Sequence, residues 1–506
     1  MRILIANRGE IAVRLVRACR ELGLESVAVY SDVDRTQPHV LAADRAVRIG
    51  PSPAPESYLN QDAVLAAARA SGAQAIHPGY GFFAENAHFA RAVEAAGLTW
   101  IGPSPDVIEL LGSKTAAREL AARVGVPVVP GSDPLPDAVA ALAFAERVGY
   151  PVLLKAVGGG GGKGMRLVRG AGEVAEALSR AGAEGAAFFA DARVYAEKYI
   201  ERPRHIEVQI IGDRHGNLVH VGERECSLQR RHQKVFEEAP SVAVDGTLRA
   251  RLGAAAVAVA RAAGYRSAGT VEFLLAPSGE FFFLEVNTRL QVEHPVTELV
   301  YGVDLAQEMI RESLGEAISL RQEALTPRGH ALECRVYAED PLRGFAPSPG
   351  TIALLQRPGG PGVRVDSGVR EGSVVPLDYD PMLAKLLVWA EDRPRALARL
   401  GRALTEYRIG GIATTLPLFR LLLDVPAFQR GELHTGMLDE LLAAASVEAL
   451  EARGDPALEE LAIVAAACLN FEAASRLPRD GFDVSEREGA RWRDEGRRTA
   501  HGRYPR

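Results

Sequence analysis

The sequence predicts a mixed fold, α/β at its N-terminus and α+β beyond it, divided into about three domains. Its 506 residues correspond to roughly three domains of about 150 residues each. In the first ~110 residues, short apolar segments alternate with helical ones, which is typical of a parallel sheet with helical crossovers. Farther along, residues alternate from His205 to Ile211, which places His205, Glu207 and Gln209 on one face of a strand. This segment and a tight turn between apolar runs indicate antiparallel strands.

The N-terminal elements follow from apolar periodicity. Arg2 to Ala6 reads as a buried strand, and Glu10 to Leu22 as a helix that ends at Gly23. Further strands are expected at Val27–Tyr30, Ala75–His77 and Thr99–Ile101. The turn at residues 7–10 reads NRGE and lacks the G-x-G-x-x-G of a dinucleotide fold, which argues against an NAD site.

Composition excludes several classes of protein. The net charge of −6 and the absence of a basic domain argue against nucleic-acid binding. The four cysteines (Cys19, Cys226, Cys334 and Cys468) are scattered without metal-type spacing, so neither a disulfide scaffold nor a zinc site is expected. No apolar run approaches the ~20 residues of a membrane span. The start does not resemble a signal peptide, so a cytoplasmic location is expected.

A run of five glycines, Gly158 to Gly162, joins a strand at Pro151–Ala156 to one at Met165–Val168. Glycine lets backbone N–H groups approach phosphate oxygens closely. The run is not a Walker A loop, because Val157 stands where its first glycine is needed and Gly164 replaces its Ser or Thr. We interpret it as a hairpin lid over a nucleotide. A mobile loop without a ligand is the alternative.

Two apolar runs, Val271–Leu275 and Phe281–Asn287, flank a predicted four-residue turn. If residue 276 pairs with residue 281, Glu272 lies directly opposite Glu285, and Asn287 shares their face. Facing carboxylates repel unless a cation lies between them, and oxygen ligands suit magnesium or manganese. The alternative is a solvated acidic face.

Several basic residues lie nearby in the sequence. Arg289, just past the predicted metal strand, offers a planar fork for a small oxyanion, and Glu293 could act as its base; the simpler interpretation is a surface ion pair. The segment 229–234 (QRRHQK) could neutralise phosphate charge or merely be a solvated face. The residue types of Lys114, Lys155 and Arg335 do not by themselves indicate a function. Only their positions in the sequence make them candidate site residues.

In this order, these segments resemble the biotin carboxylase family of the ATP-grasp superfamily, over about residues 1–440. The matching blocks are IANRGEIAVR (5–14), HPGYGFFAEN (77–86), YPVLLKAVGGGGGKGM (150–165), PRHIEVQ (203–209), ECSLQRRHQKVFEEAP (225–240), FLEVNTRLQVEHPVTE (283–298), HALECRVYAEDP (330–341) and YDPMLAKL (379–386). The resemblance implies a three-domain ATP-grasp fold, with an N-terminal parallel α/β domain, a glycine-rich lid domain and a C-terminal antiparallel-sheet domain. The implied boundaries are 1–112, 113–201 and 202–325 (the two ATP-grasp halves), 326–442, and a tail at 443–506.

The resemblance also implies residue roles. ATP would be bound by Lys114, Lys155, Gly161, Gly162, Glu197, Ile200, His205, Gln229, His232 and Leu274. Magnesium (or manganese) would be bound by Glu272, Glu285 and Asn287. Bicarbonate would contact Lys234, Arg289 and the Val292 amide. Glu293 would deprotonate it, and Arg335 would stabilise the enolate form of biotin.

The family's reaction proceeds through carboxyphosphate, made from ATP and bicarbonate, to carboxybiotin. We find no Met-Lys-Met attachment motif, so biotin is expected on a separate carrier protein. The expected partners are that carrier and a carboxyltransferase subunit of an acetyl-CoA (fatty acid biosynthesis), other acyl-CoA or pyruvate carboxylase. Family members are often homodimers.

The C-terminal region differs in character. Pro456 to Ala474 is predicted to be helical, and Arg476 to Arg506 carries nine arginines against six acids. Trp492–Gly496 is faintly similar to a linker in longer carboxylases, so the tail could dock a partner. Two other functions compete: another ATP-grasp ligase, such as a carbamoyl-phosphate synthetase half or a purine-synthesis carboxylase, and a catalytically silent nucleotide-binding scaffold.

Overall fold

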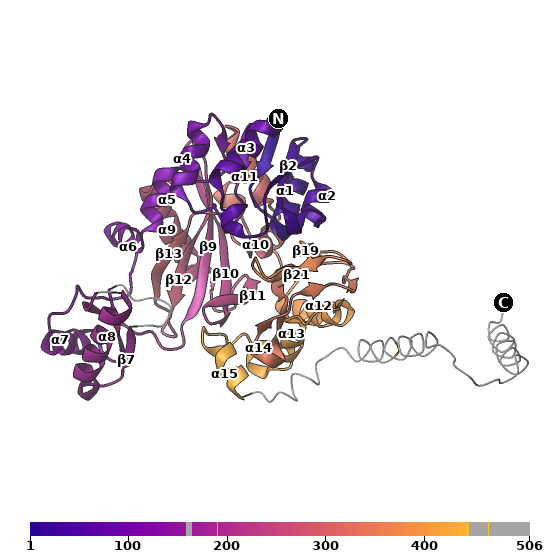
Figure 1. The fold of residues 1–506 in the computed structure, drawn as a ribbon. Helices are drawn as coiled ribbons and strands as arrows, with labels where there is room; N and C mark the ends of the chain where they lie inside the picture. The colour runs from indigo at the N-terminus through magenta and orange to yellow at the C-terminus, as the bar shows by residue number, and fades with distance from the viewer. Residues whose placement is uncertain (158–163, 190, 445–463, 465–506) are drawn as a thin grey trace, which may run out of the picture. The chain divides into compact units, whose positions relative to one another are not determined.

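The computed structural model describes residues 1–157, 164–189, 191–444 and 464 (Figure 1). Contacts divide the chain into two units, 1–454 and 455–506. The predicted helix at 456–474 and the charged tail lie outside the described residues, apart from position 464. In the described part of the chain, no helix is both long and apolar enough to span a membrane.

The N-terminal region has the predicted parallel sheet, with strand order β3-β2-β1-β4-β5. Its elements are β1 (Arg2–Ile5), α1 (Gly9–Glu21), β2 (Glu25–Ser31), α2 (Pro38–Ala42), β3 (Arg45–Gly50), α3 (Gln61–Ser71), β4 (Ala75–His77), α4 (Ala87–Ala95), β5 (Thr99–Trp100), α5 (Pro105–Gly112) and α6 (Lys114–Arg123). The strands β1 and β4 are short and almost wholly buried, as expected when helices cover both faces of a sheet.

A small three-stranded sheet, β7-β6-β8, follows. Its region contains α7 (Ala138–Val148), β6 (Val152–Ala156), β7 (Met165–Val168), α8 (Val174–Phe189) and β8 (Val194–Lys198). Strands β6 and β7 pair antiparallel around the glycine run, from Val152↔Val168 to Lys155↔Met165, which confirms the predicted hairpin. The tip of that hairpin, with Gly161 and Gly162, lies outside the described residues.

The largest element is an antiparallel sheet of eight strands, in the order β13-β12-β9-β10-β11-β14-β21-β19. The regular elements from residue 204 onward are β9 (Arg204–Gly212), β10 (Leu218–Arg230), β11 (Gln233–Ala239), α9 (Gly246–Ala262), β12 (Ser267–Leu275), β13 (Phe281–Asn287), α10 (His294–Tyr301), α11 (Leu305–Ser313), β14 (His330–Tyr337), β15 (Glu339–Asp340), β16 (Ala346–Pro347), β17 (Gly350–Thr351), β18 (Leu354–Gln356), β19 (Val363–Ser367), β20 (Val374–Val375), β21 (Met382–Ala390), α12 (Arg393–Glu406), β22 (Arg408–Gly410), α13 (Leu416–Leu423), α14 (Pro426–Gln429) and α15 (Met437–Ala444). The sheet therefore continues from the predicted ATP-grasp region into the predicted C-terminal domain.

Apolar cores hold this sheet in place. At one end, Phe273 of β12 and Leu252 of α9 are both fully buried in one cluster with α5 and α6. Burying a side chain of this size contributes about 1.5–3 kcal/mol. At the other end, α12 and α13 pack against β14 and β21. These two apolar cores stabilise both ends of the sheet, so the strands between them can accommodate buried charged side chains.

Candidate active site

The hairpin of β12 and β13 places Glu272 opposite Glu285, as predicted. The detailed prediction that residue 276 pairs with residue 281 is wrong, since Leu275 is the partner of Phe281. A register shift between Glu272 and Phe273 leaves Leu284 as the extra residue. The longer turn and this bulge offset one another, so the acids still face each other.

The predicted metal ligands lie together at this hairpin. The Asn287 side-chain amide donates to Glu272 Oε1 at 2.8 Å, and Glu272 is only 3% exposed. The Glu285 carboxylate is partly exposed and lies 3.3 Å from the ammonium of Lys114. Lys114 begins α6, whose N-cap Ser113 side chain accepts from Ala116 N. Two carboxylates and an amide oxygen form a donor set suited to magnesium.

Lys234 is the centre of a buried ionic cluster. Its ammonium lies 2.7 Å from Glu272, 2.7 Å from Glu293, and also contacts Glu207. Burial alone would lower the pKa of Lys234, but these acids raise it well above its ordinary value. Burial would likewise raise the pKa of Glu272, yet Lys234 and then His205 lower it well below the usual range. Lys234 and Glu272 therefore both carry charge at neutral pH.

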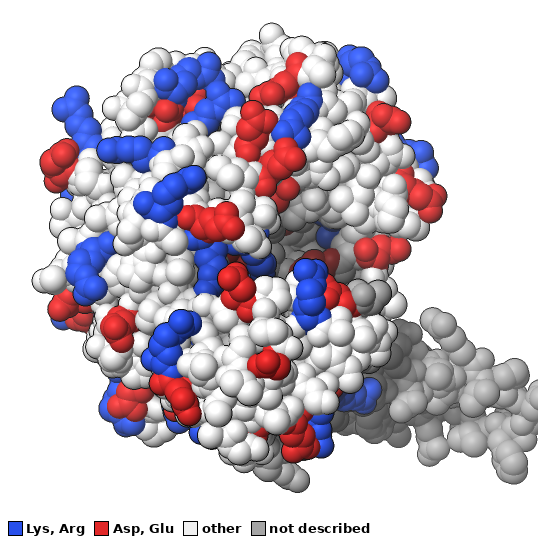
Figure 2. All heavy atoms as spheres, turned by 90° about the vertical axis from the view of Figure 1, so that its left-hand side faces the viewer, with Lys and Arg blue, Asp and Glu red and all other residues white. Residues whose placement is uncertain are grey.

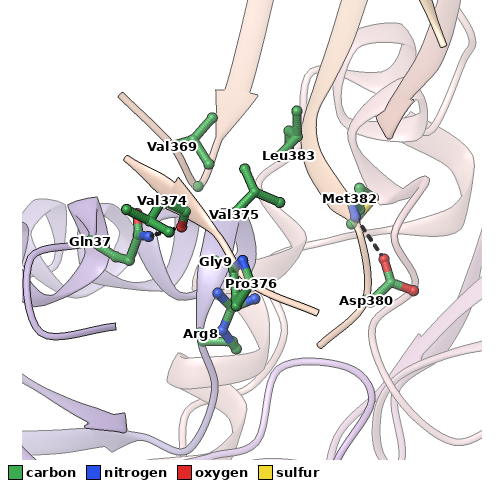
Figure 3. A pocket seen from close by; sticks show the side chains of 11 residues that line it. Arg8, Gly9, Gln37, Val369, Val374, Val375, Pro376, Asp380, Met382 and Leu383 are labelled. Carbon is green, nitrogen blue, oxygen red and sulfur yellow. Dashed lines mark hydrogen bonds between the residues drawn. The ribbon is translucent and has the colours of Figure 1, made fainter. Parts of the chain in front are cut away.

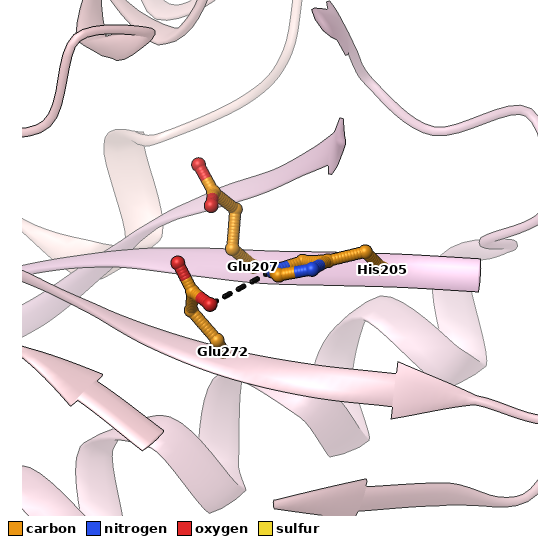
Figure 4. A group of neighbouring side chains, drawn as sticks. All are labelled: His205, Glu207 and Glu272. Carbon is orange, nitrogen blue, oxygen red and sulfur yellow. Dashed lines mark ion pairs between the residues drawn. The ribbon is translucent and has the colours of Figure 1, made fainter. Parts of the chain in front are cut away.

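Glu207 of β9 is the register partner of Glu272 on the neighbouring β12, and the His205 side chain of β9 points toward Glu272 (Figure 4). His205 Nε2 lies 2.9 Å from Glu272 Oε2, and the Gln229 amide is 2.9 Å from His205 Nδ1. Leu274 is the β12 partner of His205. His205, Gln229 and Leu274, three of the residues expected at the nucleotide, thus lie next to Glu272, one of the acids predicted to bind the metal.

Glu293 links this cluster to Arg335. Arg335 donates to Glu293 Oε2 at 2.9 Å and to Glu237 Oε1 at 2.6 Å. Burial would raise the pKa of Glu293, but Lys234, then Arg335, hold it well below its usual range. For Glu237 burial prevails over the attraction of Arg335 and raises the pKa to about 7. Glu293 is therefore ionised, and it lies beside a guanidinium that donates to two acids.

Arg289 does not pair with Glu293, the pairing that a surface ion pair would give. It donates to Glu85 Oε2 at 3.0 Å and to Asn287 Oδ1 at 2.9 Å. Glu85 also accepts from the backbone N–H of Thr288. The N-terminal region thereby fixes the segment that follows β13, where Val292 also lies.

The remaining predicted residues lie elsewhere. Lys155 on β6 contacts Glu197 on β8, and Glu197 also accepts from Arg118 at 2.9 Å. Lys155 and Glu197 therefore form an ion pair on the three-stranded sheet and not in the cluster around Lys234. Ile200 follows β8 and is partly buried. His232 is exposed in the β10–β11 turn, where its φ is 65°. In the described residues, therefore, the basic segment 229–234 contributes Gln229 and Lys234 to the cluster.

Several charged neighbours of the predicted site residues were not predicted from the sequence. Glu207 shares the face of His205, but no role was predicted for it. Fully buried Arg224 binds Glu207 and donates at 2.7 Å to both Gln209 and Gln291. The alternation of residues along β9 did predict that its polar side chains share one face. No local sequence pattern identifies Arg224, Glu237 or Glu85, because the residues that they contact are remote in sequence.

A separate cavity of about 20 Å³ lies between the N-terminal region and β19–β21 (Figure 3). Its lining includes Arg8, Gln37, Val375 and Asp380. This volume holds about one water molecule, so the cavity is too small for a nucleotide.

The face drawn in Figure 2 is hollowed, and both positive and negative side chains are visible in and around the hollow.

The fold and the site together define an ATP-grasp enzyme, an ATP-dependent ligase. Three family models match the chain. Residues 1–108 match "Biotin carboxylase, N-terminal domain", and residues 113–321 match "Carbamoyl-phosphate synthase L chain, ATP binding domain". Residues 333–440 match "Biotin carboxylase C-terminal domain". The chain is 50% identical to a biotin carboxylase of Nostoc sp. over 441 residues, covering 87% of this chain and 99% of the relative. It is 50% identical to a biotin carboxylase of Haemophilus influenzae over 443 residues, covering 87% of this chain and 98% of the relative.

A pyruvate carboxylase subunit of Methanothermobacter thermautotrophicus is 51% identical over 441 residues, covering 87% of this chain and 89% of that relative. Among solved structures, the biotin carboxylase domain of Hydrogenobacter thermophilus 2-oxoglutarate carboxylase, a dimer with MgADP, ADP and bicarbonate, matches with a TM-score of 0.79. Identity is 46%, and the match covers 87% of this chain and 97% of that one. The chain belongs to the biotin carboxylase family.

Proposed function

We propose that this chain carboxylates biotin held by a separate carrier protein, using ATP and bicarbonate. The observation that carries the proposal is the meeting of Lys234, Glu272, Glu293 and Arg335 in one buried cluster. It joins a candidate metal ligand, an anion-binding cation, an ionised base and a guanidinium. Relatives named as biotin carboxylases and as part of a pyruvate carboxylase support the same reaction.

Magnesium would be held by Glu272, Glu285 and Asn287, where it would neutralise the terminal phosphates of ATP. Lys114 and Lys155, His205 and Gln229, and the backbone near Ile200 would bind the nucleotide. His232, Leu274, Glu197, Gly161 and Gly162 complete the nucleotide site that we propose. The Glu197 carboxylate already contacts Lys155 and Arg118. It would bind the adenine in addition to these two cations.

Bicarbonate would bind between Lys234, Arg289 and the Val292 amide. When bicarbonate attracts the Lys234 ammonium, Glu293 loses the cation that most lowers its pKa and can take the bicarbonate proton. A bicarbonate oxygen then attacks the γ-phosphorus, the bond to the β-phosphate oxygen breaks, and ADP leaves carboxyphosphate behind.

Carboxyphosphate divides into CO2 and phosphate, and phosphate accepts the N1 proton of biotin. The resulting enolate carries its charge on the ureido oxygen, where the Arg335 guanidinium would stabilise it. N1 then forms a bond to the CO2 carbon. Arg335 is held by Glu237 and Glu293, so it needs no reorientation to present a fixed positive charge.

An ATP-cleavage assay tests the proposal. We expect ADP formation to require bicarbonate and to rise with free biotin. Cleavage that ignores biotin would favour another ATP-grasp ligase. Normal ATP binding without turnover would favour a silent scaffold.

We propose further that the chain acts in the cytoplasm as a homodimer with a biotin carboxyl carrier protein and a carboxyltransferase, in an acetyl-CoA, other acyl-CoA or pyruvate carboxylase. The three cysteines in the described part of the chain are free and buried, which suits a reducing compartment. Purifying the chain with its partners and probing with avidin would reveal the carrier. The carboxyltransferase that co-purifies would identify the carboxyl acceptor.

A further inference from the structure

Lys385, on strand β21, has a side chain that is fully buried. Its ammonium donates to the backbone carbonyl of Val292 at 2.7 Å. The same nitrogen lies 3.2 Å from Glu10 Oε1. A buried cation is costly unless it is paired and hydrogen-bonded, so the two contacts account for its presence at this place.

The carboxylate partner comes from a distant part of the chain. Glu10 lies in the first turn of α1 and also accepts the hydroxyl of Tyr80. Gly368, after β19, lets the two regions approach closely, because a Cβ there would lie 2.6 Å from the Glu10 backbone nitrogen. Lys385 therefore ties together the N-terminal region, the segment after β13 and the C-terminal strands.

The strands beside Lys385 carry further charges. Asp366 of β19 and Arg335 of β14 are its register partners on either side. Arg364 binds Asp366 with two hydrogen bonds, of 3.0 and 2.7 Å. Asp366 thus has Arg364 as its hydrogen-bonded cation, while the Lys385 ammonium contacts Val292 and Glu10.

We propose that Lys385 is a positioning residue for bicarbonate, acting through the backbone of Val292 and Glu293. The proposal rests on the function proposed above. Fixing the Val292 carbonyl restrains the peptide that joins Val292 to Glu293. That restraint fixes the α-carbons of Val292 and Glu293. It thereby limits rotation of the preceding peptide, which carries the Val292 N–H, and sets the point from which the Glu293 side chain projects. Lys385 itself touches neither bicarbonate nor ATP in this scheme.

The test compares Lys385→Met with the wild-type protein by steady-state kinetics. Methionine keeps the length of the side chain but neither hydrogen bond nor charge. We expect KM for bicarbonate to rise by about tenfold or more, since small misplacements of binding groups are costly, while KM for ATP changes less than about twofold. Lys198→Met is the matched control, because the Lys198 ammonium contacts the carbonyl oxygens of Gly149 and Tyr150 away from this site.

Hydrogen exchange gives a readout that does not depend on catalysis. We expect amides in residues 288–294 to exchange faster in Lys385→Met, with strand β12 unchanged. If wild-type protein shows no bicarbonate-dependent ATP cleavage, the proposed function fails, and the exchange result alone still decides whether Lys385 orders this segment.

Glu10→Gln is a second variant in case Lys385→Met does not fold. It keeps an acceptor for Lys385 and Tyr80 but removes the charge, so we expect a smaller rise in bicarbonate KM, of about threefold. An unchanged bicarbonate KM in the folded variant, equal rises in the KM for ATP and for bicarbonate, or unaltered exchange at 288–294 would each overturn the proposal.

Discussion

Replacing Lys234 with methionine should remove the cation at the centre of the acidic cluster. The ammonium contacts Glu207, Glu272 and Glu293. Breaking a buried ionic cluster on one side typically costs about 3–5 kcal/mol. Arg224 still pairs with Glu207 and Arg335 with Glu293, so we expect the lower end, a loss of about 3 kcal/mol in unfolding free energy at pH 7.5.

The loss of stability caused by Lys234→Met should also depend on pH, in a direction that follows from the pKa shifts of the acids. Lys234 lowers the pKa of Glu272 and Glu293 in the folded protein, so their ionised forms stabilise the wild-type fold above the ordinary carboxyl pKa. Without the cation, both pKa values rise from their wild-type positions, although His205 still lowers that of Glu272 and Arg335 that of Glu293. Protonation at lower pH then stabilises the folded variant. The difference in stability between the two proteins should therefore shrink as pH falls toward about 5.

Urea titrations at pH 7.5 and 5.5 measure both effects, with Lys198→Met as the control for loss of an ammonium. Bicarbonate-dependent ATP cleavage should also fall by about 100-fold or more. The reasoning is refuted if Lys234→Met destabilises no more than the control, or if the gap between variant and wild type widens at the lower pH.

The other predictions concern metal binding, biotin, acid stability and the tail. Glu285→Gln should abolish turnover by weakening magnesium binding, and unchanged activity at limiting magnesium would contradict the assignment. Arg335→Ala should slow biotin carboxylation while leaving the ATP dissociation constant unchanged; weaker ATP binding, measured by calorimetry, would show that its role is different. Burial lowers the pKa of His77 to about 3 and that of His39 to about 4, so both stay neutral in the fold, and protonation below the ordinary pKa of 6.5 favours unfolding. Each should cost about 2 kcal/mol at pH 5, and His77→Gln should lose less stability than wild type between pH 7 and pH 5. Deleting residues 446–506 should weaken partner assembly, and gel filtration showing the same complex would refute a docking role for the tail.

Much of the site could be predicted from local sequence patterns. Alternation along β9 placed His205 and Glu207 on one face, and the hairpin placed Glu272 opposite Glu285. The facing acids were predicted correctly although the turn was not, because the bulge at Leu284 restored the pairing. Strand periodicity is a property of neighbouring residues, so the sequence carries it directly.

The partners of each charge were decided by the tertiary structure. Lys234 meets acids from β9, β12 and the start of α10, and Arg289 binds Glu85 of the N-terminal region rather than Glu293. Local patterns determined the strands, the faces and the kinds of chemical group. The ionic contacts depend on which strands become neighbours in the eight-stranded sheet, and burial there makes each pairing energetically significant; neither is encoded in the spacing of residues along the chain.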